Sequence, residues 1–220
     1  MLAQPADGPS PEATFERVRL DDHSWVDVAR GWLAGADEVY DTLAQGVAWQ
    51  QGRLWRYERW VEEPRLGSWW RVGTPPPHPV IPELQKTIQA RYRVPFEGVA
   101  LAWYRDGRDG VAFHRDREMR WLEETVIAVL TLGQRRPWRL RPRANRYDHD
   151  SPLRGATHDL APAAGDLFVM GGRCQADWEH SVPKVHRPVR GRMSLQWRWT
   201  SRRGRPVQGP GYRAPRHYSR

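Results

Sequence analysis

The stretch GVALAWY (Gly98–Tyr104) begins a series of short apolar segments that decides the fold class. Each segment has the length of a strand, and Gly, Pro, Asp and Arg separate one segment from the next. Short strands at this spacing are typical of a β-sandwich or barrel. The later members of the series are TVIAVLTL (125–132), PWRLRP (137–142), GDLFVMGG (165–172) and RMSLQWRW (192–199).

The region before Gly98 contains patterns of both kinds. SWVDVA (24–29) and GRLWRYERWV (52–61) alternate as strands do, whereas GADEVYDTLAQGV (35–47) and IPELQKTIQARY (81–92) have the apolar spacing of helices. We therefore predict an α+β protein, in which an N-terminal helical layer packs on a double-stranded β-helix of the jelly-roll type.

The two ends of the chain differ from its middle in composition. Residues 1–18 are rich in Pro, Ala and acidic groups without periodicity, so we expect them to be disordered. Residues 201–220 contain six arginines and no acid, which is typical of a flexible basic tail. One domain is expected at 19–200, with an N-terminal extension at 19–98 and the jelly-roll core at 99–200.

Charge, tryptophan and cysteine content bear on the binding partners and the cellular location of the protein. The net charge is +9, and only two of the 35 basic residues, Lys86 and Lys184, are lysines. Arginine suits phosphate, although a GC-rich genome would give the same bias. Tryptophan side chains can stack on bases or fill a core, and we expect most of the 13 tryptophans to fill a core. Cys174 has no disulfide partner and no long apolar run is present, so we expect a cytoplasmic protein without membrane contact. A monomer is expected, although no pattern in the sequence determines the oligomeric state.

The segment FHRDRE (Phe113–Glu118) predicts part of a metal site. In an extended segment His114 and Asp116 point to the same face, and a jelly roll brings later segments such as WEHSVPK, which contains His180, back across the barrel mouth. Two imidazoles and a carboxylate with open coordination positions are typical of non-haem Fe(II) oxygenases. A solvated loop is the alternative for the His-Asp pair, and His186 is the alternative histidine.

Such an oxygenase needs an electron-rich co-substrate, usually 2-oxoglutarate, whose distal carboxylate must meet a buried cation. Arg192 and Arg198 are separated by an even number of residues on one expected strand, so both can face the barrel interior. Their backbones would lie roughly 20 Å apart, within reach of opposite ends of a small diacid. The alternative is an arginine-rich edge strand that faces water.

These motifs, in this order, resemble the AlkB family of Fe(II)/2-oxoglutarate-dependent nucleic-acid dealkylases. The resemblance extends from about Glu58 to Arg198. It implies Fe(II), 2-oxoglutarate and O₂ as cofactors and co-substrates. It also implies oxidative demethylation of bases such as 1-methyladenine and 3-methylcytosine in DNA or RNA, with single-stranded nucleic acid as the expected partner. The matching segments are YRDGRDGVAFHRDRE (104–118), GDLFVMGGRCQADWEHSVPK (165–184) and RMSLQWR (192–198).

The resemblance also implies roles for single residues around the iron. His114, Asp116 and His180 would be its ligands. Arg192 would bind the distal carboxylate of 2-oxoglutarate, and Arg198 would lie near the metal-bound end. Tyr104 would donate a hydrogen bond to the co-substrate, whereas Ala102 stands where relatives commonly have an asparagine, so one co-substrate hydrogen bond is missing or replaced.

On the substrate side, PRLGSWW (64–70) resembles the family's nucleotide-recognition lid, which would fall within the N-terminal extension. Trp69 and Trp70 would be the candidates to stack on a flipped base, with Trp70 preferred. Pro64 and Arg65 would shape the entrance. Glu118 would lie near the positively charged base, unless it is a solvated turn carboxylate.

Two other functions stay open at this point. The first is a 2-oxoglutarate-dependent hydroxylase or demethylase that acts on a protein or a small molecule. The second is a catalytically silent module that binds nucleic acid without iron.

Overall fold

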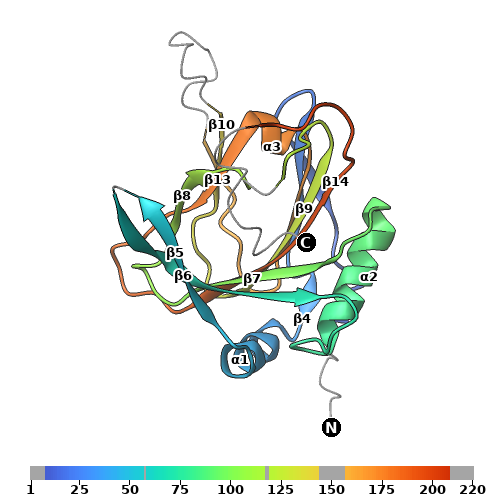
Figure 1. Ribbon diagram of the computed structural model, residues 1–220. Helices are drawn as coiled ribbons and strands as arrows, with labels where there is room; N and C mark the ends of the chain where they lie inside the picture. The colour runs from blue at the N-terminus through green and yellow to red at the C-terminus, as the bar shows by residue number, and fades with distance from the viewer. Residues whose placement is uncertain (1–7, 57, 117–118, 144–156, 209–220) are drawn as a thin grey trace.

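Two facing antiparallel β-sheets form the body of the protein. The computed structural model describes residues 8–56, 58–116, 119–143 and 157–208, and α1 and α2 lie outside its larger sheet (Figure 1). Within this part of the chain the larger sheet has the order β2 (Glu16–Arg19), β3 (Ser24–Ala29), β12 (Leu167–Gly172), β9 (Thr125–Gly133), β14 (Arg192–Thr200), β7 (Gly98–Tyr104), β6 (Arg59–Arg71) and β5 (Gln50–Arg56). The smaller sheet has the order β11 (His158–Asp159), β10 (Arg139–Pro142), β13 (Trp178–Val182) and β8 (Val111–His114), and β1 (Gly8–Pro9) pairs with β4 (Leu33–Ala34). The predicted jelly roll is confirmed.

Two cores explain why the central strands are apolar throughout. In β9, Val126 and Ala128 belong to the core between the larger sheet and the helices, while Ile127 and Val129 belong to the core between the two sheets. Successive side chains of a strand face opposite sides, so a strand that is covered on both faces needs apolar residues at every position. This arrangement leaves the inner core as the place where polar side chains of the site meet.

The predicted helices are present and carry the outer core. α1 (Ala36–Gly46) buries Val39 and Leu43, and acidic residues occupy its first turn, where the helix dipole favours them. α2 (Val80–Tyr92) buries Ile81, Leu84 and Ile88, at the spacing that one helical face requires. A third, short helix, α3 (Cys174–Asp177), leads directly into β13. None of the helices in the described ranges is both long and apolar enough to span a bilayer.

Part of the segment 1–18, which we expect to be disordered, forms short strands in the structure, at Gly8–Pro9 and from Glu16. β2 pairs with β3 in antiparallel register, and Arg17 forms a 2.7 Å ion pair with the buried carboxylate of Asp27. An edge strand held by backbone hydrogen bonds and one ion pair needs no apolar periodicity, which is why the sequence did not show it. Residues 1–7 lie outside the described ranges.

The basic tail is likewise attached to the body where it begins. The backbone N–H of Val207 donates to the carbonyl of Arg120 at 2.7 Å, and the Val207 side chain packs against the inner core. The structure thus places Val207 against the body, and the flexibility of the tail stays a prediction. Residues 209–220 lie outside the described ranges.

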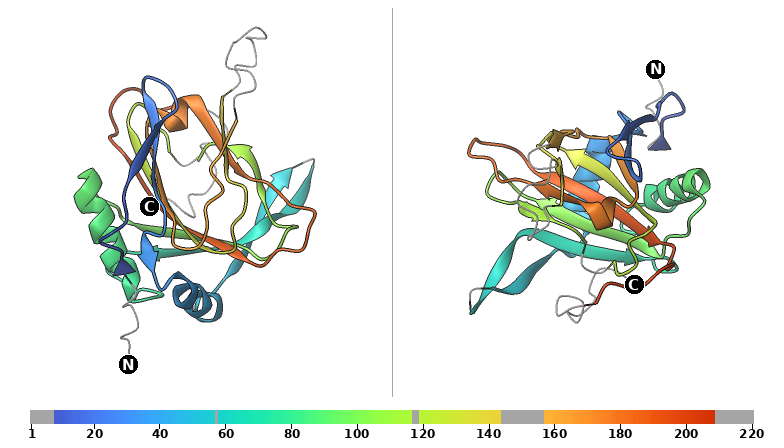
Figure 2. Two further views of the ribbon diagram at one scale, coloured as in Figure 1. Left: turned by 180° about the vertical axis from the view of Figure 1, so that it is seen from behind. Right: turned by 90° about the horizontal axis from the view of Figure 1, so that it is seen from above.

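The segment GRLWRYERWV contains a hairpin rather than one strand. β5 and β6 pair from Arg56 and Arg59 inward, and the far part of this hairpin projects from the body (Figure 2). PRLGSWW lies inside β6 and is hydrogen-bonded to β7. Because β3 and β6 pair with core strands, there is no structural boundary between 19–98 and 99–200.

Candidate metal centre

The smaller sheet brings two histidines together. β8 and β13 are antiparallel neighbours in which His114 pairs with His180, and the centroids of the two rings lie 4.4 Å apart. Nδ1 of His114 lies 2.8 Å from the carbonyl oxygen of Ala112. A proton on Nδ1 would satisfy that carbonyl and leave Nε2 unprotonated, as a metal ligand must be.

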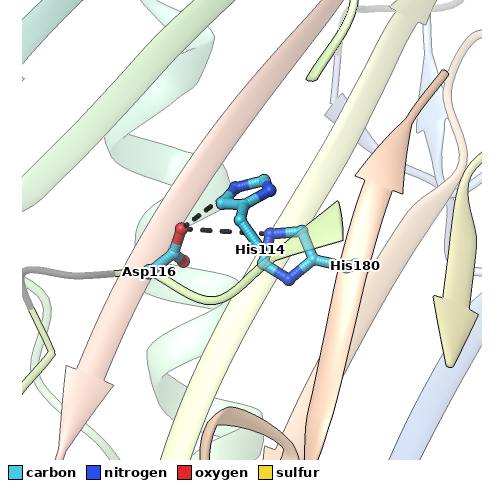
Figure 3. A group of neighbouring side chains, drawn as sticks. All are labelled: His114, Asp116 and His180. Carbon is cyan, nitrogen blue, oxygen red and sulfur yellow. Dashed lines mark ion pairs between the residues drawn. The ribbon is translucent and has the colours of Figure 1, made fainter. Parts of the chain in front are cut away.

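Asp116 completes the group from the segment that follows β8. Its Oδ1 lies 3.9 Å from Nε2 of His114 and 3.9 Å from Nε2 of His180 (Figure 3). One ligand atom from each residue falls within 4.8 Å of the others, so a single ion can contact all three. The predicted convergence of His114, Asp116 and His180 is thus observed, whereas the alternative histidine, His186, is exposed and is not part of the group.

The surroundings hold these side chains in the protonation states that bind a metal. Burial alone would raise the pKa of Asp116, but Arg198, whose Nε lies 2.8 Å from Oδ2, and the two imidazoles outweigh it, so the pKa falls below its usual range. Burial, together with the neighbouring His114, lowers the pKa of His180 to about 3. Burial also lowers the pKa of His114. At neutral pH the site therefore offers two neutral imidazoles and one carboxylate.

A buried cation lies deeper on β14. Arg192 is fully buried, and its guanidinium donates to the hydroxyls of Ser194 at 2.8 Å and Thr131 at 3.1 Å. No carboxylate in the described ranges forms an ion pair with it, and its Nε has no hydrogen-bond acceptor there. Burial lowers the pKa of Arg192 to about 10. A buried guanidinium without an acid is a fitting partner for the distal carboxylate of 2-oxoglutarate.

One pocket between the two sheets contains the metal-binding group and reaches Ser194, the hydrogen-bond partner of Arg192. The metal-binding triad, Tyr104, Ser194 and Gln196 supply its polar lining, and Arg65 reaches it from β6. Burial would lower the pKa of Arg65, but the neighbouring Tyr104, Glu63 and Asp116 raise it. Its apolar lining consists of Val111, Ile127, Val129, Trp138, Met170 and Val182.

The structure separates the two tryptophans proposed for base stacking. Trp70 is buried in the outer core, and its indole N–H donates to the carbonyl of Thr74 at 3.0 Å. The preference for Trp70 is therefore wrong, because a residue on that face of β6 cannot meet a ligand in the inner core. Trp69 points to the opposite face. It pairs with Ala100 of β7, which in turn pairs with Gln196 of β14. Gln196 lines the pocket, but Trp69 does not.

Three other predicted residues have different outcomes. Pro64 accepts a backbone hydrogen bond from Gly110 at 2.9 Å, so it joins β6 to the loop after β7 and does not stand free at an entrance. Ala102 pairs with Ser194 across β7 and β14. Glu118 lies outside the described ranges.

Sequence reasoning missed Thr131, Trp138 and Gln175. Thr131 lies in the apolar run of β9, Trp138 lines the pocket beside His180, and the side chain of Gln175 accepts a hydrogen bond from the backbone of Asp116. None belongs to a spaced motif. Once Ile127 and Val129 are known to face the inner core, the two-residue period of a strand places Thr131 on the same side.

Comparisons with known proteins agree with this geometry. The model of the 2OG-Fe(II) oxygenase superfamily matches residues 42–205. Alpha-ketoglutarate-dependent dioxygenase alkB homolog 3 of Bos taurus is 28% identical over 177 residues, which are 76% of this chain and 62% of that protein. The human DNA oxidative demethylase ALKBH2 is 28% identical over 180 residues, 75% of this chain and 69% of that protein. The chain thus spans less than two thirds of the length of the alkB homolog 3 protein.

Solved structures support the fold. A prolyl hydroxylase from Trichoplax adhaerens superimposes with a TM-score of 0.57 at 14% identity, covering 79% of this chain and 83% of that one. OsALKBH1 superimposes with a TM-score of 0.54 at 13% identity, covering 84% of this chain and 100% of that one. The family match and the His-Asp-His group together confirm the expected Fe(II), 2-oxoglutarate and O₂. The chain belongs to the 2OG-Fe(II) oxygenase superfamily.

Proposed function

We propose that the protein removes methyl groups from alkylated bases of nucleic acid, of the 1-methyladenine and 3-methylcytosine type. One O₂ is consumed with each 2-oxoglutarate, which loses CO₂ and becomes succinate with one of the oxygen atoms. The other oxygen enters the N-methyl group as a hydroxyl, and the resulting hemiaminal breaks its N–C bond, releasing formaldehyde and the repaired base. Iron with its co-substrate supplies this oxidising chemistry when bound.

The observation that carries the proposal is the shared pocket. A complete two-histidine, one-carboxylate group lines the pocket together with Tyr104 and Ser194. Directly behind these two residues lies Arg192, a buried arginine without an acidic partner in the described ranges, which donates to the Ser194 hydroxyl at 2.8 Å. Burying an uncompensated guanidinium is unfavourable unless an anion joins it. A family relationship to proteins named as DNA demethylases directs the proposal towards nucleic acid.

The chain's own residues bind the co-substrate, orient the metal-binding side chains and exclude water. Arg192, steadied by the hydroxyls of Thr131 and Ser194, would hold the distal carboxylate, and the Tyr104 hydroxyl would donate to the same co-substrate. Arg198 holds Oδ2 of Asp116 and so directs Oδ1 towards the imidazoles. The apolar lining keeps water away from the reacting methyl group.

The projecting β5–β6 hairpin is the surface that we assign to nucleic acid. Trp55 and Trp60 are 60% and 59% exposed, and their rings meet edge to face with centroids 5.6 Å apart. Exposed Arg53 and Arg59 flank this pair. Aromatic faces beside guanidinium groups suit unstacked bases and their phosphates, which supports single-stranded nucleic acid as the partner. We also propose that the protein binds nucleic acid as a monomer.

The test measures formaldehyde from a single-stranded oligonucleotide that contains 3-methylcytosine, with Fe(II), 2-oxoglutarate and O₂. We expect release by the wild type and none by His114→Ala. His186→Ala is the matched control, because this exposed histidine lies outside the metal-binding group, and it should release formaldehyde as the wild type does.

Each other outcome contradicts the proposal in a distinct way. Iron binding and 2-oxoglutarate turnover that no methylated oligonucleotide stimulates would indicate a protein or small-molecule substrate. Oligonucleotide binding without any iron binding would indicate a silent module.

A further inference from the structure

The strand ladder places only two of the three metal-binding side chains. β8 ends at His114, opposite His180 of β13, and this is the last pair of the ladder towards Asp116. Asp116 follows the end of β8, and within the described residues no strand hydrogen bond holds its backbone N–H, although its carbonyl accepts a hydrogen bond from Met119 of the same loop at 3.2 Å. Its carboxylate must nevertheless reach the same point as the two imidazoles, so something else has to fix this part of the chain.

Gln175 supplies the missing backbone contact. The N–H of Asp116 donates to Oε1 of Gln175 at 2.8 Å, and Gln175 is 0% exposed. Gln175 belongs to α3, which continues directly into β13 and therefore into His180. One short segment, residues 174–182, thus carries one metal-binding residue and holds the backbone of another.

The character of the Gln175 side chain points to a specific role. Its Nε2 is buried without a hydrogen-bond acceptor in the described part of the chain. A buried amide donor without an acceptor is unfavourable, and an apolar residue of the same length would fill this space without that penalty. Arg198 holds the Asp116 carboxylate, but it does not hold the Asp116 backbone, so the two contacts are not redundant.

We propose that Gln175 is a positioning residue of the metal centre, whose side-chain carbonyl fixes the backbone of Asp116 so that Oδ1 meets the two imidazoles. This inference rests on the proposed iron site. Outer contacts that orient a metal ligand typically change metal affinity by roughly 10-fold to 100-fold when they are removed. We expect a loss in this range for Gln175.

The experiment titrates the purified full-length protein with Mn(II) and, under anaerobic conditions, with Fe(II), and measures the dissociation constant by calorimetry. Gln175→Met keeps the length of the side chain and removes the acceptor, and it should bind both ions roughly 10-fold to 100-fold more weakly. Gln175→Asn keeps a neutral amide but moves its oxygen away from the Asp116 backbone, so it should also bind both ions more weakly. This variant replaces Gln175→Met in the test if Gln175→Met does not fold. Gln175→Glu retains an acceptor oxygen and should restore affinity to within about threefold of the wild type.

Gln85→Met is the matched control. Gln85 is a buried amide that bonds the carbonyl of Phe96 and the indole of Trp197 in the outer core. This variant should lower the Tm and leave the metal dissociation constant unchanged, which separates a loss of packing from a loss of positioning.

Two results distinguish failure of this inference from failure of the metal centre. If Gln175→Asn and Gln175→Met bind Mn(II) as the wild type does while His114→Ala does not bind it, the centre stands and the role of Gln175 is refuted. If His114→Ala binds Mn(II) as tightly as the wild type, the centre itself is wrong.

Discussion

Arg192 shows how one residue can bind a ligand at the expense of stability. Its guanidinium has two hydroxyls and the Tyr104 ring, 5.5 Å away, as neighbours, but no acid in the described ranges. Burial shifts the pKa from 12.5 to about 10, which corresponds to a penalty on the order of 3 kcal/mol for the charged form in the folded state. At pH 7, below both values, this penalty is fully present, and it is relieved only as the pH rises through 10.

Replacing Arg192 should therefore have opposite effects on binding and stability. In Arg192→Met the KM for 2-oxoglutarate should rise roughly 100-fold, or about 2.7 kcal/mol, because the distal carboxylate loses its cation. The free energy of unfolding without co-substrate should rise by about 1 kcal/mol, because the unpaired charge is gone.

Urea unfolding and 2-oxoglutarate turnover measure the two quantities. The control is Arg139→Met, an exposed arginine that pairs with Asp159 at 3.2 Å, and it should change each quantity by less than about 0.5 kcal/mol. A lower stability of Arg192→Met together with an unchanged KM would show that Arg192 has only a structural role.

At the scale of elements, contacts between loops help to hold the two sheets together beside the site. Arg136 follows β9, is 1% exposed, and donates to the carbonyls of Asp106, Asp109 and Pro183 at 2.8 to 2.9 Å. It thereby ties the loop after Tyr104 to the segment after His180. A backbone hydrogen bond from Val185 to Gly107, at 2.9 Å, joins the same two segments, so Arg136 reinforces the link between the co-substrate side and the metal side of the pocket.

Arg136→Met should lower the free energy of unfolding by at least about 3 kcal/mol, because three carbonyl groups lose a charged donor. Thermal unfolding with Arg135→Met as the control measures this. Arg135 is its exposed neighbour with a single 2.9 Å bond to Ala161, and its replacement should cost less than about 1 kcal/mol. Equal losses in the two variants would contradict the prediction.

The projecting hairpin should contribute to nucleic-acid binding and not to the chemistry. The double variant Trp55→Ala/Trp60→Ala should bind single-stranded oligonucleotides about 1 to 3 kcal/mol more weakly per base stacked, roughly 5-fold to 150-fold. Its affinity for 2-oxoglutarate should not change, because neither ring lines the pocket.

Fluorescence anisotropy with a labelled oligonucleotide measures the affinity. Val72→Ala is the control, since Val72 is a large hydrophobic residue that is 50% exposed and lies beyond the end of β6. A double variant that binds as tightly as Val72→Ala would remove the hairpin from the interface.

At the scale of the whole molecule, the positive charge is spread over surface and tail. The net charge is +9, and residues 209–220 contain three of the arginines, Arg213, Arg216 and Arg220. Charges that contact phosphates release counterions, so they determine how steeply affinity falls with salt. Cytoplasmic location and the monomeric state stay predictions.

Truncation after Gln208 should therefore flatten the salt dependence of oligonucleotide binding. If all three arginines contact phosphates, the slope of log K against log salt should change by about 2. Binding curves at several salt concentrations measure the slope, with formaldehyde release as the check that the pocket is intact. An unchanged slope would show that the tail does not touch the strand.

Much of the fold could be predicted because the central strands are covered on both faces. Gly98–Tyr104 and Ser24–Ala29 are strands with the predicted bounds, since continuous or alternating apolar residues leave few other ways to bury them. β2, β13 and the division of 52–61 into a hairpin could not be predicted. Their residues are polar or mixed, so no clear apolar pattern marks them, and β13 in addition pairs with a strand that is distant in sequence.

The sequence by itself determined the chemistry of the site: which residues can bind a metal, which strand carries Arg192 and Arg198, and which face they share. Only the tertiary structure decided that Trp70 is core, that Arg65 reaches the pocket, and that Gln175 holds the backbone of Asp116. Alternation along a strand is a local property of the chain, so it can be read from spacing. Which strands become neighbours, and which loop packs on which ligand, depends on contacts between distant segments that no local pattern encodes.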